Sequence, residues 1–232
     1  MKNVCFIGAY DKLELILCIA KILKMLGNEI LIIDATELQK SKYIVPTINP
    51  TTKYITSFED IDIALGFESY DDIENYILET EGKKLKYTYA LVNIDDQDKF
   101  VNFNNEATFK NYFVTNLELY AIRKGLDTIK KIKKPIKVEK VIFSRNFLPE
   151  DEQYIDFYSL GYKIIWDENK IKFPYEIENM EAMMESQKNF KITIRNLSVE
   201  YKSALENLIS DIIPDINISN IRKIMKNLEK EG

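Results

Sequence analysis

Histidine is absent from this chain of 232 residues. Histidine is the commonest general base and the commonest metal ligand near neutral pH, so its absence excludes Ser-His-Asp and Cys-His mechanisms built from this chain alone. Cysteine is almost as scarce, because Cys5 and Cys18 are the only two and both lie in strongly apolar segments. We expect them to be buried free thiols in a reducing compartment.

Long apolar runs and a strong net charge are also missing. No apolar stretch reaches about 18 residues, so the sequence predicts no transmembrane helix. The net charge is −5 and the pI is near 5.1, which gives no support to nucleic-acid binding by the chain as a whole. Apolar residues make up 46%, enough for a large core, and no signal-peptide pattern precedes the first expected strand. These features predict a globular, cytoplasmic protein.

Strand and helix patterns alternate along the chain. Strands are expected over residues 3–8, 29–35, 87–94, 110–115 and 138–144, with short ones over 162–166 and 171–173. Helices are expected over residues 12–26, from a capping box at Ser69 to Leu78, and over 117–132, 180–187 and 198–213. Repeated units of this length predict an α/β fold with a doubly wound, mostly parallel sheet flanked by helices. We expect one domain over residues 1–213 and a helical tail over 214–232.

The junction between the first strand and the first helix has the outline of a phosphate-binding turn. Its residues are Gly8, Ala9, Tyr10, Asp11, Lys12, Leu13 and Glu14. The turn contains one glycine, and it lacks the Gly-Lys pair and the Ser/Thr of a phosphate-binding loop. Asp11 and Glu14 bring negative charge to the place of a phosphate. The frame is that of a nucleotide-binding protein, whereas the loop lacks the groups that bind the phosphates.

Several segments in this order resemble the MinD/ParA family of deviant Walker-A ATPases, especially divergent members attached to pilus and secretion systems. EILIIDA, which contains Asp34, resembles the strand with the family's acidic residue. DIDIALGFESYDDIENYI and YFVTNLELYAIRKGLDTI resemble the segments before and after the Walker-B strand, and Phe173-Pro174-Tyr175 resembles the element beside the adenine. The likeness covers most of residues 1–213 and implies a P-loop NTPase-type fold.

The departures from the family fall at its catalytic positions. Lys12 alone remains of the loop, Asn93 stands at the Walker-B aspartate with Asp95 two residues on, and Ser144 stands at the base-reading position. The resemblance therefore implies a vestigial nucleotide site without catalytic or metal-binding residues, formed by Gly8, Ala9, Tyr10, Asp11, Lys12, Leu13, Asp34, Asp95, Ser144 and Pro174. We expect no required cofactor, with ATP or ADP bound only if the loop is remodelled.

Individual charged residues allow two interpretations. Lys12 either touches a phosphate or is a solvated residue at a helix start. Asp34 lies at a strand end where α/β ligands bind, and positions water or metal if it has a functional role. Asp95, Asp96 and Asp98 are either a solvated acidic loop, which we favour, or a site for Mg²⁺ or Ca²⁺.

Two regions are basic although the chain is acidic. The first consists of Arg123, Lys124, Lys130, Lys131, Lys133, Lys134, Lys137 and Lys140, which form either a DNA- or membrane-contacting patch or a solvated helix face. The second is the amphipathic tail, with Ile218, Ile221, Met225 and Leu228 on one face and Arg222 among its cations. This helix either lies on a membrane or packs on the domain or on a dimer partner.

These features favour a non-hydrolysing scaffold or adaptor that positions or recruits a membrane-associated assembly of the pilus or secretion type. Its partners would be proteins of that machine, with a homodimer and peripheral membrane contact through the tail also expected. One alternative is an atypical ATPase switch that uses Lys12, Asp34 and Asp95. The other is a DNA-partitioning protein that uses the basic residues between 123 and 140, although the acidic balance disfavours nucleic acid.

Overall fold

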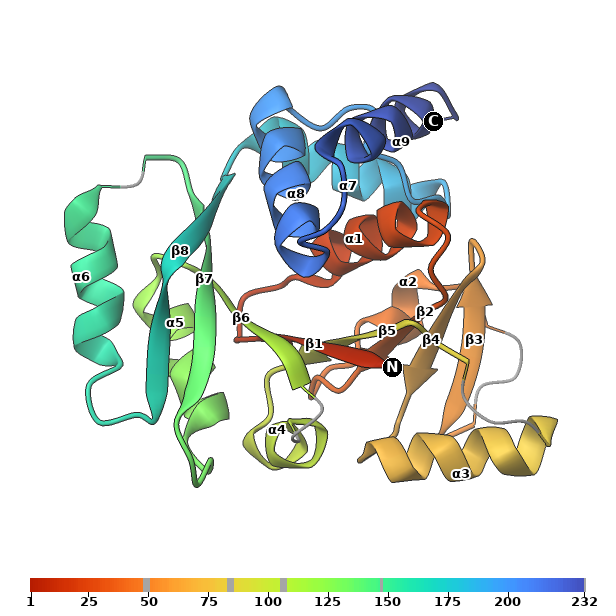
Figure 1. Cartoon of the computed structure of the whole chain (residues 1–232), viewed down its shortest axis with the longest axis horizontal. Helices are drawn as coiled ribbons and strands as arrows, with labels where there is room; N and C mark the ends of the chain where they lie inside the picture. Colours follow the sequence, from red (N-terminus) through yellow and green to blue (C-terminus); the bar gives the residue numbers. More distant parts are fainter. Residues whose placement is uncertain (48–50, 83–85, 105–107, 147, 232) are drawn as a thin grey trace.

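The computed structural model describes residues 1–47, 51–82, 86–104, 108–146 and 148–231 (Figure 1). Its centre is an eight-stranded sheet with the order β3-β4-β2-β5-β1-β6-β7-β8. The strands are β1 (Lys2–Ile7), β2 (Ile30–Asp34), β3 (Tyr54–Phe58), β4 (Ile61–Leu65), β5 (Tyr89–Ile94), β6 (Thr108–Asn116), β7 (Ile136–Ser144) and β8 (Ile164–Pro174). All neighbours pair in parallel except β3 and β4, which form an antiparallel hairpin. The predicted doubly wound, mostly parallel sheet is confirmed.

Helices cover both faces of this sheet (Figure 1). One layer contains α1 (Leu13–Met25), α7 (Ile177–Lys188), α8 (Val199–Ile212) and α9 (Ile218–Glu231). The opposite layer contains α3 (Tyr70–Glu81), α4 (Gln97–Phe103), α5 (Leu119–Ile129) and α6 (Pro149–Tyr158), and the short α2 (Ser41–Ile44) follows β2. The sheet is therefore buried on both sides, as parallel sheets require.

The period of a β-strand explains how one apolar run supplies two cores. Val4 and Phe6 of β1 point into the core beneath α1 and α8, while Cys5 and Ile7 point into the core beneath α4 and α5. Both cysteines are buried and free, as expected. Burial raises the pKa of the Cys5 thiol to about 12, which leaves it unreactive as a thiolate near neutral pH.

The structure corrects four local expectations. The polar stretch after Asp34 contains α2 and strand β3, neither of which the sequence pattern predicts. Helix α6 was not predicted. The two short late strands form one strand, β8, whose pairing shifts register between Val138 and Lys140 of β7. Asp96 does not belong to an open acidic loop, because its carboxylate caps α4 by accepting hydrogen bonds from the backbone N–H groups of Asp98 and Lys99.

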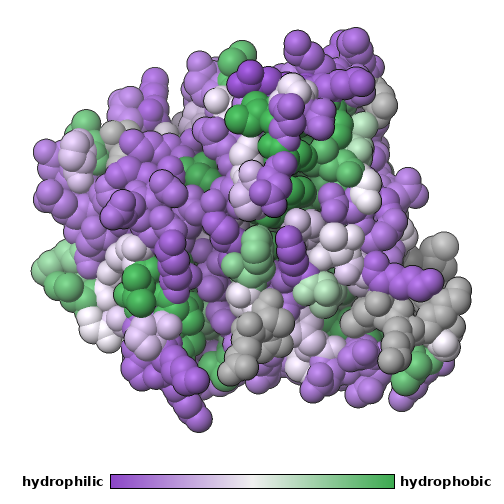
Figure 2. Space-filling view, viewed as in Figure 1, coloured by the Kyte–Doolittle hydropathy of each residue, from purple (hydrophilic) through white to green (hydrophobic). Residues whose placement is uncertain are grey.

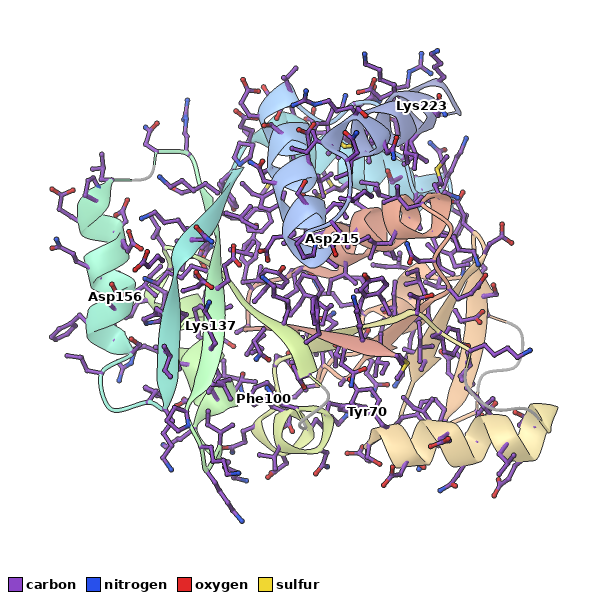
Figure 3. The ribbon with its side chains drawn as sticks, in the orientation of Figure 1. Tyr70, Phe100, Lys137, Asp156, Asp215 and Lys223 are labelled. Carbon is purple, nitrogen blue, oxygen red and sulfur yellow. The ribbon has the colours of Figure 1, made fainter. Side chains whose placement is uncertain are left out.

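The amphipathic tail is α9, and its apolar face lies against α1 and α8. Ile221, Met225 and Leu228 are buried, whereas Ile218 is half exposed. Arg222 on the outer face pairs with Glu206 of α8 at 2.8 Å, and Lys223 lies on the outside of α9 (Figure 3). Of the two interpretations of the tail, packing on the domain is therefore the one that the structure shows, because burial against α8 removes these side chains from water.

The division into residues 1–213 and a tail of 214–232 stays a prediction. Among the described residues, no helix combines the length and the apolar character needed to cross a membrane. The face shown in Figure 2 is mainly hydrophilic, with hydrophobic residues showing in separate groups, one of them between α8, α9 and α1.

Candidate functional site

The β1–α1 loop lies at the carboxyl end of β1, where α/β proteins bind their ligands. Gly8 begins the loop with φ +135°, and its N–H donates a hydrogen bond to the Ile94 carbonyl of β5 at 3.1 Å. A Cβ at this position would lie 2.4 Å from the backbone oxygen of Val114 in β6. The single glycine of the loop is thus needed for close passage between two strands, not for a flexible phosphate cradle.

The side chain of Lys12 binds the backbone of its own loop. The residue is only 3% exposed, and its Nζ donates a hydrogen bond to the carbonyl oxygen of Gly8 at 2.6 Å. Burial lowers the pKa of the Lys12 ammonium to about 8, against the opposing effect of Asp95, Asp11 and Asp34. The only lysine of residues 8–14 is therefore held by the loop's own backbone.

Carboxylates occupy the rest of the loop's surroundings. Asp11 pairs with Lys40 and also accepts a hydrogen bond from the N–H of Leu13 at 3.3 Å. Asp95 accepts a hydrogen bond from the N–H of Glu37 at 2.9 Å, and burial raises the pKa of its carboxyl. Two carboxylates and two lysines therefore share the site, so the positive potential that a triphosphate needs is largely cancelled.

A pocket of about 260 Å³ opens over the loop. This volume lies below the ~300 Å³ at which ligand pockets usually begin. The predicted residues Gly8, Ala9, Tyr10, Asp11, Lys12 and Asp95 line it, together with Thr36, Leu38, Lys40, Asn93 and Tyr120, of which only Asn93 had been singled out. Leu38 and Tyr120 come from the loop after β2 and from α5, so only the tertiary fold brings them to this rim.

Asp34 lies beside this pocket, but its carboxylate is hydrogen-bonded to neighbouring residues of the fold. One carboxylate oxygen accepts hydrogen bonds from the N–H and hydroxyl of Thr36, at 3.3 and 2.6 Å. The other accepts from the N–H and hydroxyl of Ser41, at 3.1 and 2.6 Å. The residue is 1% exposed, and each oxygen already has two donors. Asp34 therefore ties the loop after β2 to the start of α2, and its lone pairs are not available to a water or a metal.

The remaining predicted site residues do not reach the pocket. Leu13 is buried in the core beneath α1. Ser144 and Pro174 are paired neighbours at the ends of β7 and β8. The side of the loop toward these strands is filled instead by aromatic packing, because Tyr10 packs on Phe143 with 4.8 Å between ring centroids. The nucleotide-site role of these residues stays a prediction.

Asn93 lines the pocket and has a buried side-chain amide oxygen without a hydrogen-bond partner among the described residues. It lies near the end of β5 and is 4% exposed. Its place at the Walker-B position stays a prediction from the resemblance. A buried amide oxygen of this kind needs a donor, which a water in the pocket can supply. Within residues that the structure describes, no group of three or more Asp, Glu or Cys side chains could hold a metal ion.

The basic residues between 123 and 140 are partly neutralised by ion pairs. Lys124 lies 3.7 Å from Glu37, Lys131 lies 2.5 Å from Asp98, and Lys137 lies 2.6 Å from Asp167. Lys140 is buried and pairs with Glu152 and Asp156 of α6. The positions of Lys137 and Asp156 can be followed in Figure 3. Half of the eight cations thus have carboxylate partners, which weakens the case for an anionic partner at this surface. A surface role for Arg123, Lys124, Lys130 and Lys131 stays a prediction.

Comparison with solved structures places this geometry in a known fold. A chain of the MinC:MinD cell division protein complex of Aquifex aeolicus superimposes with a TM-score of 0.58 at 13% identity, over 94% of this chain and 97% of that one. The fold is that of MinD and ParA proteins. A ParA family ATPase from Chlorobium tepidum TLS gives 0.52 at 15% identity, over 93% of this chain and 98% of that one.

The septum site-determining protein MinD of Pyrococcus horikoshii OT3, complexed with Mg-ADP, gives 0.52 at 14% identity, over 91% of this chain and 95% of that one. No protein-family model and no curated protein matches the sequence. The MinD/ParA fold suggested by the sequence motifs is therefore confirmed.

Proposed function

We propose that this chain is a scaffold or adaptor with the MinD/ParA fold that does not hydrolyse ATP. It positions or recruits a membrane-associated assembly, of the pilus or secretion type, through contacts with proteins of that assembly. The observation that carries the proposal is the hydrogen bond from Lys12 Nζ to the Gly8 carbonyl, because it places the loop's only lysine on the loop's own backbone.

ATP hydrolysis needs several groups at once. Backbone amides and a lysine hold the phosphates, and a hydroxyl and a carboxylate orient the metal. In this chain the lysine is engaged, Leu13 follows it in place of Ser/Thr, and Asn93 stands at the Walker-B-like position. Each missing electrostatic contact removes about 3 to 4 kcal/mol of transition-state stabilisation. Together these losses support a protein that does not turn ATP over.

Calorimetric titration with ATP and ADP, with and without Mg²⁺, tests this part of the proposal. We expect no binding heat at nucleotide concentrations of about 1 mM. A dissociation constant above 1 mM means a binding free energy of less than about 4 kcal/mol. The matched variant is Lys12→Met, which keeps the length of the side chain and removes its charge. Micromolar binding that Lys12→Met abolishes would contradict the proposal and establish the nucleotide switch instead.

Self-association is the second part of the proposal. Leu38 and Tyr120 rim the pocket and are 72% and 71% exposed. Large apolar side chains that stand this far out at a pocket are typical of protein interfaces. We propose that two copies pair through this rim, by side-chain packing and without bound nucleotide between them.

The rim pairing predicts a specific mutational result. Leu38→Glu and Tyr120→Glu should each weaken the dimer at least tenfold, or about 1.4 kcal/mol, because they bring a charge into an apolar contact. Sedimentation equilibrium across micromolar concentrations measures the effect. Phe157→Glu, at an aromatic residue of α6 that is 64% exposed, is the control and should leave the dimer intact. A wild-type monomer at every concentration, or equal loss in the control, would refute the rim as the interface.

A further inference from the structure

Helix α7 exposes an apolar stripe. Ile177, Met180 and Met184 are 70%, 36% and 50% exposed, and their spacing of three and four residues places them on one face of the helix. Tyr175 just before the helix and Val199 at the start of α8 are exposed as well. Contiguous apolar surface of this kind on a soluble protein usually marks an interaction site.

The opposite face of α7 is anchored to the body of the protein. The side chain of Asn179 is buried and makes two hydrogen bonds to Ser198. Its Nδ2 donates to Ser198 Oγ at 3.1 Å, and its Oδ1 accepts from the Ser198 N–H at 2.8 Å. Near the other end, Gln187 donates to Glu14 of α1 at 2.7 Å. Figure 1 shows α7 lying beside α1 and α8. The apolar stripe is therefore presented by a rigid element, and burying it inside this molecule would require breaking these contacts.

A row of carboxylates runs alongside the stripe. Glu178, Glu181 and Glu185 follow one another at helical spacing on the flank of α7, and Glu200 lies across from its first turn in the same hollow as Glu178. Within the described residues, Glu178, Glu181 and Glu200 form no ion pair, although fifteen other pairs occur there. The flank of α7 therefore carries net negative charge, since Lys188 in the last turn is the only cation on the helix.

The hollow at the start of α7 has a volume of about 470 Å³. Tyr175 and Ile177 form its apolar part, and Glu176, Glu178 and Glu200 outnumber the single cation, Arg145. An apolar anchor that enters this hollow would thus be flanked mainly by carboxylates.

We propose that the α7 surface, made of Ile177, Met180 and Met184 with Glu178, Glu181 and Glu200 beside them, docks a basic amphipathic helix of a protein partner. Methionine adapts its shape to different apolar side chains, which suits a helix laid along the stripe. The unpaired carboxylates select Lys and Arg on the partner's flank. This inference extends the proposed adaptor function, because it names the chemistry of the partner.

Binding of a synthetic peptide tests the surface. The probe is a fluorescein-labelled amphipathic helix with Leu at helical spacing and Lys on its other face, and the control peptide has Glu in place of every Lys. Fluorescence anisotropy should show micromolar binding of the Lys peptide and at least tenfold weaker binding of the Glu peptide. Met180→Ser combined with Met184→Ser should weaken binding of the Lys peptide at least tenfold, while Phe157→Ser on α6 should change it less than twofold.

Substitution of the glutamates measures how much charge contributes to peptide binding, separately from the apolar stripe. Glu178→Gln combined with Glu181→Gln should weaken binding of the Lys peptide about fivefold at low salt and reduce its salt dependence, since two attractive charges are removed. Equal binding of both peptides, or no effect of the α7 substitutions, would overturn the proposal. A homodimer that dissociates in the Met180→Ser, Met184→Ser variant would also overturn it, because the occupant would then be a second copy. Failure here leaves the nucleotide titration unaffected, since that pocket lies at the β1–α1 loop.

Discussion

Gly8→Ala is expected to cost about 3 to 5 kcal/mol of unfolding free energy, a large share of the ~5 to 15 kcal/mol that holds a typical domain together. Gly8 has φ +135°, where residues with a side chain are strained by about 1 to 3 kcal/mol. The new Cβ would also lie 2.4 Å from the Val114 oxygen, which belongs to a central strand and cannot move away without breaking the sheet. The midpoint of urea denaturation measures the loss.

Gly27→Ala separates backbone strain from steric conflict. Gly27 also has a positive φ, +86°, but a Cβ there would meet no atom within 4 Å. This variant should therefore lose only about 1 to 2 kcal/mol, the cost of a left-handed backbone conformation for a residue with a side chain. If the two variants lost the same amount, the close approach of Gly8 to β6 would not be what makes glycine necessary.

Glu139→Gln is expected to remove a pH-dependent loss of stability of up to about 3 kcal/mol. Glu139 lies on β7 with its side chain 5% exposed, and the nearest cation, Lys110 Nζ, is 3.9 Å from its Oε2. Burial, followed by the neighbouring carboxylate of Asp211, raises the pKa of Glu139 from 4.5 to about 7. The carboxylate of Asp167 raises the pKa of Glu139 further. Asp211 itself accepts hydrogen bonds from Tyr112 and Lys110.

The direction of the effect follows from this pKa. Below pH 4.5 the glutamate is protonated in both the folded and the unfolded chain, so its contribution to stability is fully present. Between pH 4.5 and 7 only the unfolded chain ionises, and stability falls by about 1.4 kcal/mol per pH unit. The amide introduced by Glu139→Gln cannot ionise, so the variant should match the wild type near pH 4.5 and exceed it at pH 8. Thermal unfolding at both pH values measures the difference.

The exposed Glu168 of β8 provides a matched control. Glu168→Gln should change stability little at either pH, because its side chain is already in water. Parallel stability curves for the wild type and Glu139→Gln across pH 4.5 to 8 would show that the buried carboxyl is not protonated in the folded protein. Such a result would mean that Lys110 and Tyr112 hold Asp211 of α8 without a proton on Glu139.

Local patterns predicted those elements whose residues carry their own signals. Ser69 was expected to cap a helix, and its hydroxyl accepts the N–H of Asp72 at 3.2 Å. The two short strands predicted over 162–166 and 171–173 are parts of one strand, β8. The polar residues 167–170 between them lie where the pairing of β8 with β7 shifts register. Strand β3 escaped prediction because its alternation is weak and its partner, β4, pairs with it in antiparallel fashion.

The amino-acid sequence by itself determined the sheet and the content of the loop. Apolar runs such as those at Val4–Ile7 and Ile30–Ile33 can be buried only between two layers. The chain has no histidine, and its loop over residues 8–14 has no Gly-Lys pair and no Ser/Thr, so those groups are missing from the loop in any conformation. The tertiary structure alone decided how the remaining charges are used. Lys12 meets the Gly8 carbonyl, and Asp34 meets Thr36 and Ser41, because backbone angles and turns bring them together. Likewise α9 hides its apolar face while α7 exposes one, since burial depends on the neighbouring helices and not on the periodicity that both helices share.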